Sequence, residues 1–218
     1  MKIEKTADGS NTLYLRDMDE HYHSVKGALT ESEHIFINMG LKHSLTENPR
    51  ILEIGFGTGL NAFLTAMEAV KGGRKIFYTS IEKYPLDVET VRLLQYPENI
   101  APDKSELFYS LHQAEWNTPQ DINEYFTLEK IHGDFTEYQF NDGYDIIYFD
   151  AFAPEKQPEM WSQELFNNLF CKLNHGGILT TYCAKGIVRR MLQAAGFIVE
   201  RLPGPPGGKR EILRGTKE

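Results

Sequence analysis

Glu53-Ile-Gly-Phe-Gly-Thr-Gly59 is the stretch that decides the fold. It begins at the end of a short apolar run, Ile51–Ile54, and it leads into a helix-length amphipathic stretch, Leu60–Val70. Glycines at alternate positions between a strand and a helix let the backbone turn sharply and approach a bound nucleotide closely. The sequence therefore predicts a nucleotide-type cofactor at the end of the first strand of an α/β fold.

The spacing of these glycines indicates the class of cofactor. A dinucleotide fingerprint has its third glycine one position later, where this chain has Leu60. The observed G-x-G-x-G spacing is typical of S-adenosylmethionine (SAM)-dependent methyltransferases, in which the loop packs under adenosine and methionine and no pyrophosphate needs a helix N-terminus. We expect SAM as the cofactor. The turn would supply the cofactor-binding residues Gly55, Gly57, Thr58, Gly59 and Asn61.

Short apolar runs rich in β-branched and aromatic residues alternate with amphipathic stretches along the chain, as in βα units. The other expected strands are Ile76–Ile81, Phe126–Ile131, Asp145–Phe149, Ile178–Tyr182, Phe197–Arg201 and Glu211–Leu213. The other expected helices are Leu86–Gln95, Lys104–Ala114, Glu159–Lys172 and Gly186–Ala195. This pattern predicts a Rossmann-like class I methyltransferase fold with a seven-stranded, mainly parallel sheet. Its terminal strand would be antiparallel, because Pro203–Gly208 reads as the loop of a hairpin.

The length of 218 residues fits one compact domain. We expect residues 50–218 to form the methyltransferase domain and residues 1–49 to form an accessory segment, a small hairpin and a helix packed on the core. The hairpin would pair Thr12–Leu15 with His21–Ser24. The sequence has no apolar run of membrane-spanning length, no secretory signal and only two cysteines. We therefore expect a cytoplasmic protein without membrane contact.

Acidic residues stand at the ends of three successive expected strands. Glu53 is placed to meet the amino group of the cofactor, Glu82 its ribose hydroxyls, and Asp134 the amine of its adenine. Lys83 and Phe135 lie beside these acids and are expected to bind the cofactor too. Each acid alone can be a helix cap or a solvated charge. Their joint occurrence favours a binding site, because ligands bind at the carboxyl edge of such sheets.

A further acid, Asp150, ends the hydrophobic strand of Tyr144-Asp-Ile-Ile-Tyr-Phe-Asp-Ala-Phe-Ala-Pro154. Amino-group methyltransferases use a side chain and backbone carbonyls at this corner to hold the nucleophilic nitrogen, with an aromatic ring against the substrate. We expect Asp150 to be catalytic and to contact the cofactor. The carbonyl of Ala151, the ring of Phe152 and Pro154 would bind the substrate. The alternative is that Asp150 caps the turn or the next helix.

Charge is distributed unevenly. The net charge of −8 argues against indiscriminate binding to polyanions, because phosphate contacts depend on lysine and arginine. From Lys185 onward, however, eight basic residues stand against three acidic ones. This permits a basic face on an acidic protein, with an ordinary solvated helix side as the alternative.

Longer motifs resemble one family. They are Ile51–Asn61, Ile81–Leu86, Tyr148–Trp161, Gly208–Leu213 and, more weakly, Ser24–Phe36. The sequence resembles the methyltransferase half of the bacterial MnmC family, which also occurs alone as MnmD-like enzymes. The resemblance implies SAM-dependent N-methylation of the 5-aminomethyl group of (2-thio)uridine at the tRNA wobble position, giving 5-methylaminomethyl-(2-thio)uridine. Asn99–Glu124 matches no motif of the family.

The resemblance also implies partners. The chain would bind the anticodon arm of tRNA, and we expect phosphate contacts from Arg189, Arg190, Lys209 and Arg210. Bifunctional members carry an oxidase that uses FAD, for which this chain has no room, so we expect a separate FAD-dependent oxidase acting upstream.

The sequence also allows three other interpretations. His21-Tyr-His23 has a spacing that can bind metal, but no third ligand is evident and we expect no metal. An aminopropyltransferase of the spermidine synthase type would also pair an acid with an amine and a sulfonium. A non-catalytic RNA-binding protein is the third, against which the intact Glu53, Glu82 and Asp150 argue.

Overall fold

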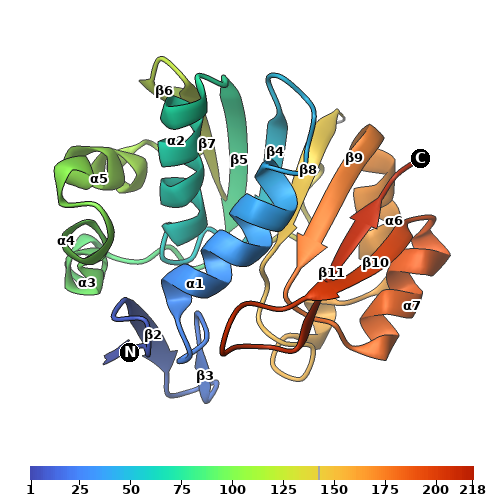
Figure 1. The fold of residues 1–218 in the computed structure, drawn as a ribbon, viewed down its shortest axis with the longest axis horizontal. Coiled ribbons are helices and arrows are strands. Elements are labelled where there is room, and N and C mark those ends of the chain that lie inside the picture. Colours follow the sequence, from blue (N-terminus) through green and yellow to red (C-terminus); the bar gives the residue numbers. More distant parts are fainter. Residues whose placement is uncertain (142) are drawn as a thin grey trace.

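The sheet at the centre of the molecule has eight strands. The computed structural model describes residues 1–141 and 143–218. The strand order is β10 (Ile198–Pro203), β11 (Glu211–Thr216), β9 (Leu173–Thr181), β8 (Tyr144–Phe149), β4 (Arg50–Ile54), β5 (Ile76–Glu82), β7 (Phe126–His132) and β6 (Gln120–Asn123) (Figure 1). The five strands from β9 to β7 are parallel, whereas β11 is antiparallel to both of its neighbours. The predicted Rossmann-like fold is confirmed.

The count of seven strands is one short. The additional strand β6 pairs antiparallel with β7 at the sheet edge, and it lies in the stretch that matched no family motif. Its residues, Gln-Asp-Ile-Asn, are mainly polar, so no apolar alternation marks them as a strand. Main-chain pairing to the neighbouring strand forms this element.

Helices cover both faces of the sheet, and each face has its own hydrophobic cluster. On one face lie α1 (Ala28–Ser32), its π-helical continuation η1 (Glu33–Leu41), α2 (Leu60–Gly72) and α5 (Ser105–Gln113). On the other lie α6 (Gln163–Lys172) and α7 (Gly186–Ala195). The short helices α3 (Val88–Leu94) and α4 (Tyr96–Ile100) lie next to α5 (Figure 1). Two 3-10 turns, η2 (Pro102–Lys104) and η3 (Pro158–Met160), complete the set.

The first 49 residues contribute a three-stranded antiparallel sheet and the helix formed by α1 and η1. The strands are β1 (Lys2–Lys5), β2 (Asn11–Leu15) and β3 (Glu20–His21), so the predicted hairpin exists with a shorter second strand and an additional first one. Leu13 and Phe36 share a buried cluster with Ile51 and Tyr148 of the large sheet. The boundary between residues 49 and 50 stays a prediction.

Within residues 1–141 and 143–218, no helix combines the length and the apolar character that crossing a membrane requires.

Candidate active site

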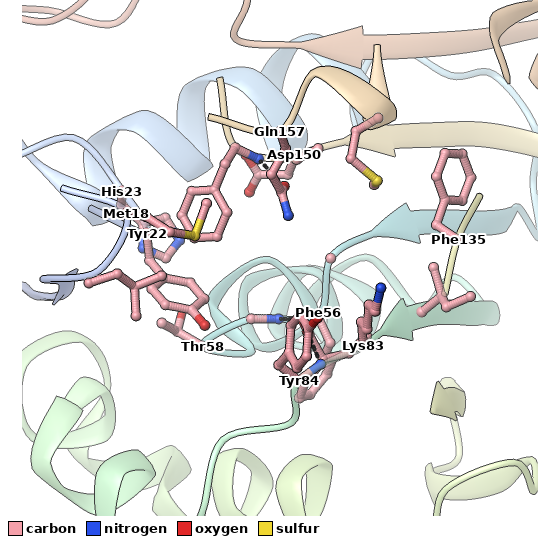
Figure 2. A pocket seen from close by; sticks show the side chains of 18 of the residues that line it. Met18, Tyr22, His23, Phe56, Thr58, Lys83, Tyr84, Phe135, Asp150 and Gln157 are labelled. Atoms are coloured by element: carbon pink, nitrogen blue, oxygen red, sulfur yellow. Dashed lines mark hydrogen bonds between the residues drawn. The ribbon is translucent and has the colours of Figure 1, made fainter. Parts of the chain in front are cut away.

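Four acids gather at one edge of the sheet because the strands that precede them are parallel neighbours. Glu53 lies in β4, Glu82 ends β5, Asp134 follows β7 by two residues, and Asp150 follows β8 directly. Figure 2 shows Asp150 between Tyr22 and His23 on one side and Phe135 on the other. The arrangement is the one that the strand ends predict.

A cavity of about 510 Å³ lies at this edge. Its volume is in the range of small-molecule and cofactor sites. Nine of the residues predicted to bind the cofactor line it: Gly55, Gly57, Thr58, Asn61, Glu82, Lys83, Asp134, Phe135 and Asp150. Glu53 and Gly59 are not among the residues that line it.

The glycine turn has positive φ angles, which strain the backbone of any residue other than glycine. Gly57 has φ +50°, and a Cβ there would lie 3.1 Å from the ring of Tyr22. Gly59 has φ +72°, and a Cβ there would lie 2.7 Å from Nε2 of His112. The turn therefore needs glycine both for its conformation and for the close packing of its neighbours.

Glu82 ties the glycine turn to the end of β5. Its Oε2 accepts a hydrogen bond from the backbone N–H of Gly57 at 2.9 Å, and its Oε1 accepts one from that of Tyr84 at 2.7 Å. These bonds fix the carboxylate at the cavity wall.

Asp134 is held by the residues beside it. Lys83 Nζ lies 2.7 Å from its Oδ2, and Thr136 donates to its Oδ1 through both the backbone N–H and the hydroxyl. The hydrogen bond from Lys83 is the main reason why the pKa of Asp134 falls to about 2. The carboxylate is thus charged throughout the physiological range.

Glu53 is fully buried and only partly hydrogen-bonded. The hydroxyl of Ser80 donates to its Oε2 at 2.7 Å, while its Oε1 is buried without a partner. Burial, together with the charge of Asp150, raises the pKa of Glu53 to about 8. A buried carboxylate oxygen without a donor fits the amino group of a cationic cofactor.

Asp150 faces the cavity and is held by one side chain. Asn61 Nδ2 donates to its Oδ2 at 2.8 Å, and burial raises its pKa to about 8. The capping alternative is wrong for the next helix: α6 begins after Ser162, whose hydroxyl accepts from the N–H of Leu165 at 3.2 Å. The predicted helix start at Glu159 is correspondingly early, since that residue lies in η3.

Three side chains form hydrogen bonds with the backbone of the turn after Asp150. Trp161 Nε1 donates to the carbonyl of Phe152 at 2.7 Å, and Gln157 Oε1 accepts from the N–H of Phe152 at 3.2 Å. The hydroxyl of Tyr182 donates to the carbonyl of Ala151 at 2.9 Å. These bonds set the direction in which Asp150 leaves β8.

A second cavity of about 350 Å³ adjoins the first. The residues that line both are Tyr22, His23, Asp150, Ala151 and Phe152. Its other lining residues include two acids, Glu20 and Glu31, the aromatic Tyr182 and one basic residue, Lys209. Acids and flat rings suit a cationic group attached to a planar ring.

Comparison with known proteins identifies the family to which the chain belongs. A family model described as S-adenosyl-L-methionine-dependent methyltransferase matches residues 108–218, about half of the chain. The chain belongs to this family. SAM is accordingly the cofactor of the methyltransferase.

Among solved structures, MnmC2 from Aquifex aeolicus is similar over 98% of this chain and 69% of its own, with 26% identity and a TM-score of 0.75. The predicted resemblance to the MnmC-type methyltransferase is confirmed. Spermidine synthase from Thermotoga maritima shares the fold over 100% of this chain and 72% of its own, with 13% identity and a TM-score of 0.58.

The residues predicted to bind the substrate of the methyltransferase fall into two groups. Ala151, Phe152 and Lys209 line the second cavity. Pro154, Arg189, Arg190 and Arg210 line neither cavity. Lys209 is engaged within the protein, because its Nζ lies 2.7 Å from Oε1 of Glu31.

Sequence reasoning missed the contribution of the N-terminal segment to the site. Tyr22 lines both cavities, and so does His23, which was weighed only as a metal ligand. His23 is buried with its Nδ1 unpartnered, and burial lowers its pKa to about 4, so the ring is neutral at physiological pH. His21 lines the second cavity only, and its Nε2 lies 3.0 Å from Oε2 of Glu4. The position of His21-Tyr-His23 within the second strand of the predicted hairpin was the available signal.

Proposed function

We propose that this methyltransferase transfers the methyl group of SAM to the 5-aminomethyl nitrogen of (2-thio)uridine at the wobble position of tRNA. The observation that carries the proposal is the position of Asp150, which lines both cavities. A carboxylate at that junction is suited to hold an amine next to a methyl donor.

In this proposal the larger cavity holds the cofactor, which supplies an electrophilic methyl group on a sulfonium. Glu53 offers its unpartnered oxygen to the amino group, Glu82 accepts from the ribose hydroxyls, and Asp134 meets the amine of adenine. Phe135 packs against the ring. The glycine turn provides the close backbone wall.

Asp150 acts on the acceptor amine. The amine attacks in its neutral form, and ionised Asp150 accepts a hydrogen bond from it and stabilises the ammonium that develops. Asn61 keeps the carboxylate oriented through its hydrogen bond to Oδ2. Tyr22, Phe152 and Tyr182 provide rings around the second cavity for a pyrimidine that has left the stack of the anticodon loop.

Two partners belong to the proposal. The tRNA would meet Arg189, Arg190 and Arg210 through its phosphates, outside the two cavities. A separate FAD-dependent oxidase would act upstream where the wobble base carries a carboxymethyl group. The place of action would be the cytoplasm, where tRNA is modified.

The test is incubation of the protein with labelled SAM and unfractionated tRNA from a strain that lacks the modification, followed by nucleoside analysis. We expect label in 5-methylaminomethyl-(2-thio)uridine. Polyamine products from decarboxylated SAM and putrescine would instead select an aminopropyltransferase. Binding of tRNA without any transfer would select a non-catalytic RNA-binding protein.

The phosphate contacts have their own test. Arg210→Glu should raise the KM for tRNA and reduce the dependence of binding on salt concentration, because each lost phosphate contact lowers the number of released counterions. Lys42→Glu, at a lysine that lines neither cavity, is the control. An unchanged KM and salt slope in Arg210→Glu would remove this residue from the tRNA interface.

A further inference from the structure

An ion pair beside the second cavity joins two segments that the proposed chemistry leaves unused. Lys209 lies in the loop between β10 and β11, and Glu31 lies in α1, 178 positions away in sequence. The loop reaches down to the start of α1 (Figure 1). Nζ of Lys209 is 2.7 Å from Oε1 of Glu31 and 4.1 Å from the ring centre of Tyr182.

Glu31 is the fixed partner. Its side chain is 10% exposed, against 41% for Lys209, and its Oε2 accepts from the backbone N–H of Ser24 at 2.9 Å. The lysine is therefore drawn to a carboxylate that α1 and the segment after β3 already hold in place.

The pair shares the second cavity with Asp150. Glu31, Lys209, His23 and Asp150 all line the second cavity, and Lys209 is the only lysine or arginine among the described residues that do so. The titratable groups that interact with Asp150 or share the second cavity with it come from several elements. They are Glu53 from β4, Tyr78 from β5, Glu20 and His21 of β3, Tyr22 and His23 after β3, Glu31 from α1, Tyr182 after β9 and Lys209. Of the two charges in the pair, Glu31 raises the pKa of Asp150 and Lys209 lowers it.

We propose that the Lys209–Glu31 ion pair is a positioning element for the acceptor site: each partner neutralises the other, which leaves the carboxylate of Asp150 available to the acceptor amine. The proposal rests on the proposed function in giving Asp150 that amine as its partner. Without Glu31, the ammonium of Lys209 is free to bind Asp150 in the place of the substrate. Without Lys209, an uncompensated carboxylate stands beside Asp150 and opposes its ionisation.

The two single variants should therefore act in opposite directions. Ionised Asp150 is the active form, so activity rises with pH through its pKa. In Lys209→Met this rise should move to higher pH by about one unit, and in Glu31→Gln to lower pH by about one unit. Glu31→Gln should also raise the KM for tRNA, since Lys209 competes for Asp150.

The double variant is the decisive one. With both charges removed, Lys209→Met/Glu31→Gln should return the pH profile close to that of the wild type. Lys209→Arg should preserve the profile, because the guanidinium keeps the charge. The matched control is the Lys42–Glu68 pair, at 3.3 Å, which lines neither cavity; Lys42→Met and Glu68→Gln should leave the profile unchanged.

A second measurement makes the test independent of tRNA methylation. Calorimetry across pH gives the ratio of the affinities for SAM and for S-adenosylhomocysteine. These ligands differ only in the transferred methyl group and the positive charge that it places on sulfur. The ratio therefore reports the response of the site to that charge. The pH at which this ratio rises should move up in Lys209→Met and down in Glu31→Gln, as for the activity. If the wild type does not methylate tRNA, the proposed function fails while this ratio still tests the ion pair.

Shifts of the same sign in both single variants, or no shift in either measurement, would overturn the proposal. If Glu31→Gln fails to fold, the comparison of Lys209→Met with Lys209→Arg decides, since the side chain of Lys209 is largely outside the core.

Discussion

Binding of the cofactor should release protons from the protein. The pKa values of Glu53 and Asp150 are both raised to about 8, in each case mainly by burial. An acid with a pKa of about 8 is about nine-tenths protonated at pH 7. A ligand that carries a sulfonium and an ammonium favours the ionised form of both groups. At pH 7 we expect the release of between about one and two protons for each SAM bound.

Glu53→Gln tests this count. The variant lacks one of the two titrating groups, so it should release close to one proton fewer than the wild type at pH 7. Calorimetry in two buffers with different ionisation enthalpies gives the number of protons directly. Glu68→Gln, at a surface carboxylate, should release as many as the wild type.

The raised pKa of Glu53 also determines how the free energy of unfolding changes with pH. In the unfolded chain this carboxyl ionises near 4.5, whereas in the free folded protein it ionises at about 8. Between these values the folded state binds more protons, so the contribution of Glu53 to the free energy of unfolding falls as pH rises through this window. Glu53→Gln should flatten that fall in urea titrations. Equal proton release by wild type and Glu53→Gln, with equal pH dependence of stability, would refute the reasoning.

Three further predictions concern the same site. Asp150→Asn keeps an oxygen that accepts from Asn61, so it should still bind SAM but lose about 100-fold or more in kcat; wild-type turnover would remove Asp150 from the chemistry. Gly59→Ala should lower the free energy of unfolding, measured in urea, by about 1 kcal/mol more than Gly73→Ala. Both glycines have positive φ, but only at Gly59 would a Cβ come into close contact with a ring, that of the half-buried His112. Equal losses would contradict that account. Trp161→Phe leaves the carbonyl of Phe152 without its hydrogen bond. It should lower the free energy of unfolding by about 1 kcal/mol in urea titrations and raise the KM for tRNA in steady-state kinetics. An unchanged KM would show that this bond does not position the turn.

The gathering of the acids and the glycine turn at one edge of the sheet was predictable because its signals are local. Parallel strands place their carboxyl ends at one edge, so the acids of β4, β5, β7 and β8 converge once the strands are recognised. The spacing of Gly55, Gly57 and Gly59 indicated the turn, and their positive φ angles are the reason why glycine is needed there. Helix α7 was predicted with its observed bounds, since a helical apolar face and a following glycine mark its ends.

On the acceptor side, Asp150, Ala151 and Phe152 were predicted, but the contribution of the N-terminal segment was not predictable from local patterns. Glu31 and Lys209 meet only after the sheet has folded, and a single sequence carries no mark of a pair so far apart. His23 lies two residues after the end of β3 and lines both cavities together with Asp150, which no local pattern indicates. The polar start of β9, at Leu173 instead of Ile178, was missed for the same reason as β6: sheet pairing overrides a weak apolar pattern.

A crystal structure with sinefungin tests the central claim most directly, because this analogue carries an amine where SAM carries the transferred methyl group. We predict that sinefungin lies in the larger cavity with that amine hydrogen-bonded to the carboxylate of Asp150 and directed at the second cavity. Sinefungin bound elsewhere, or bound with its amine pointing away from Asp150, would contradict the account.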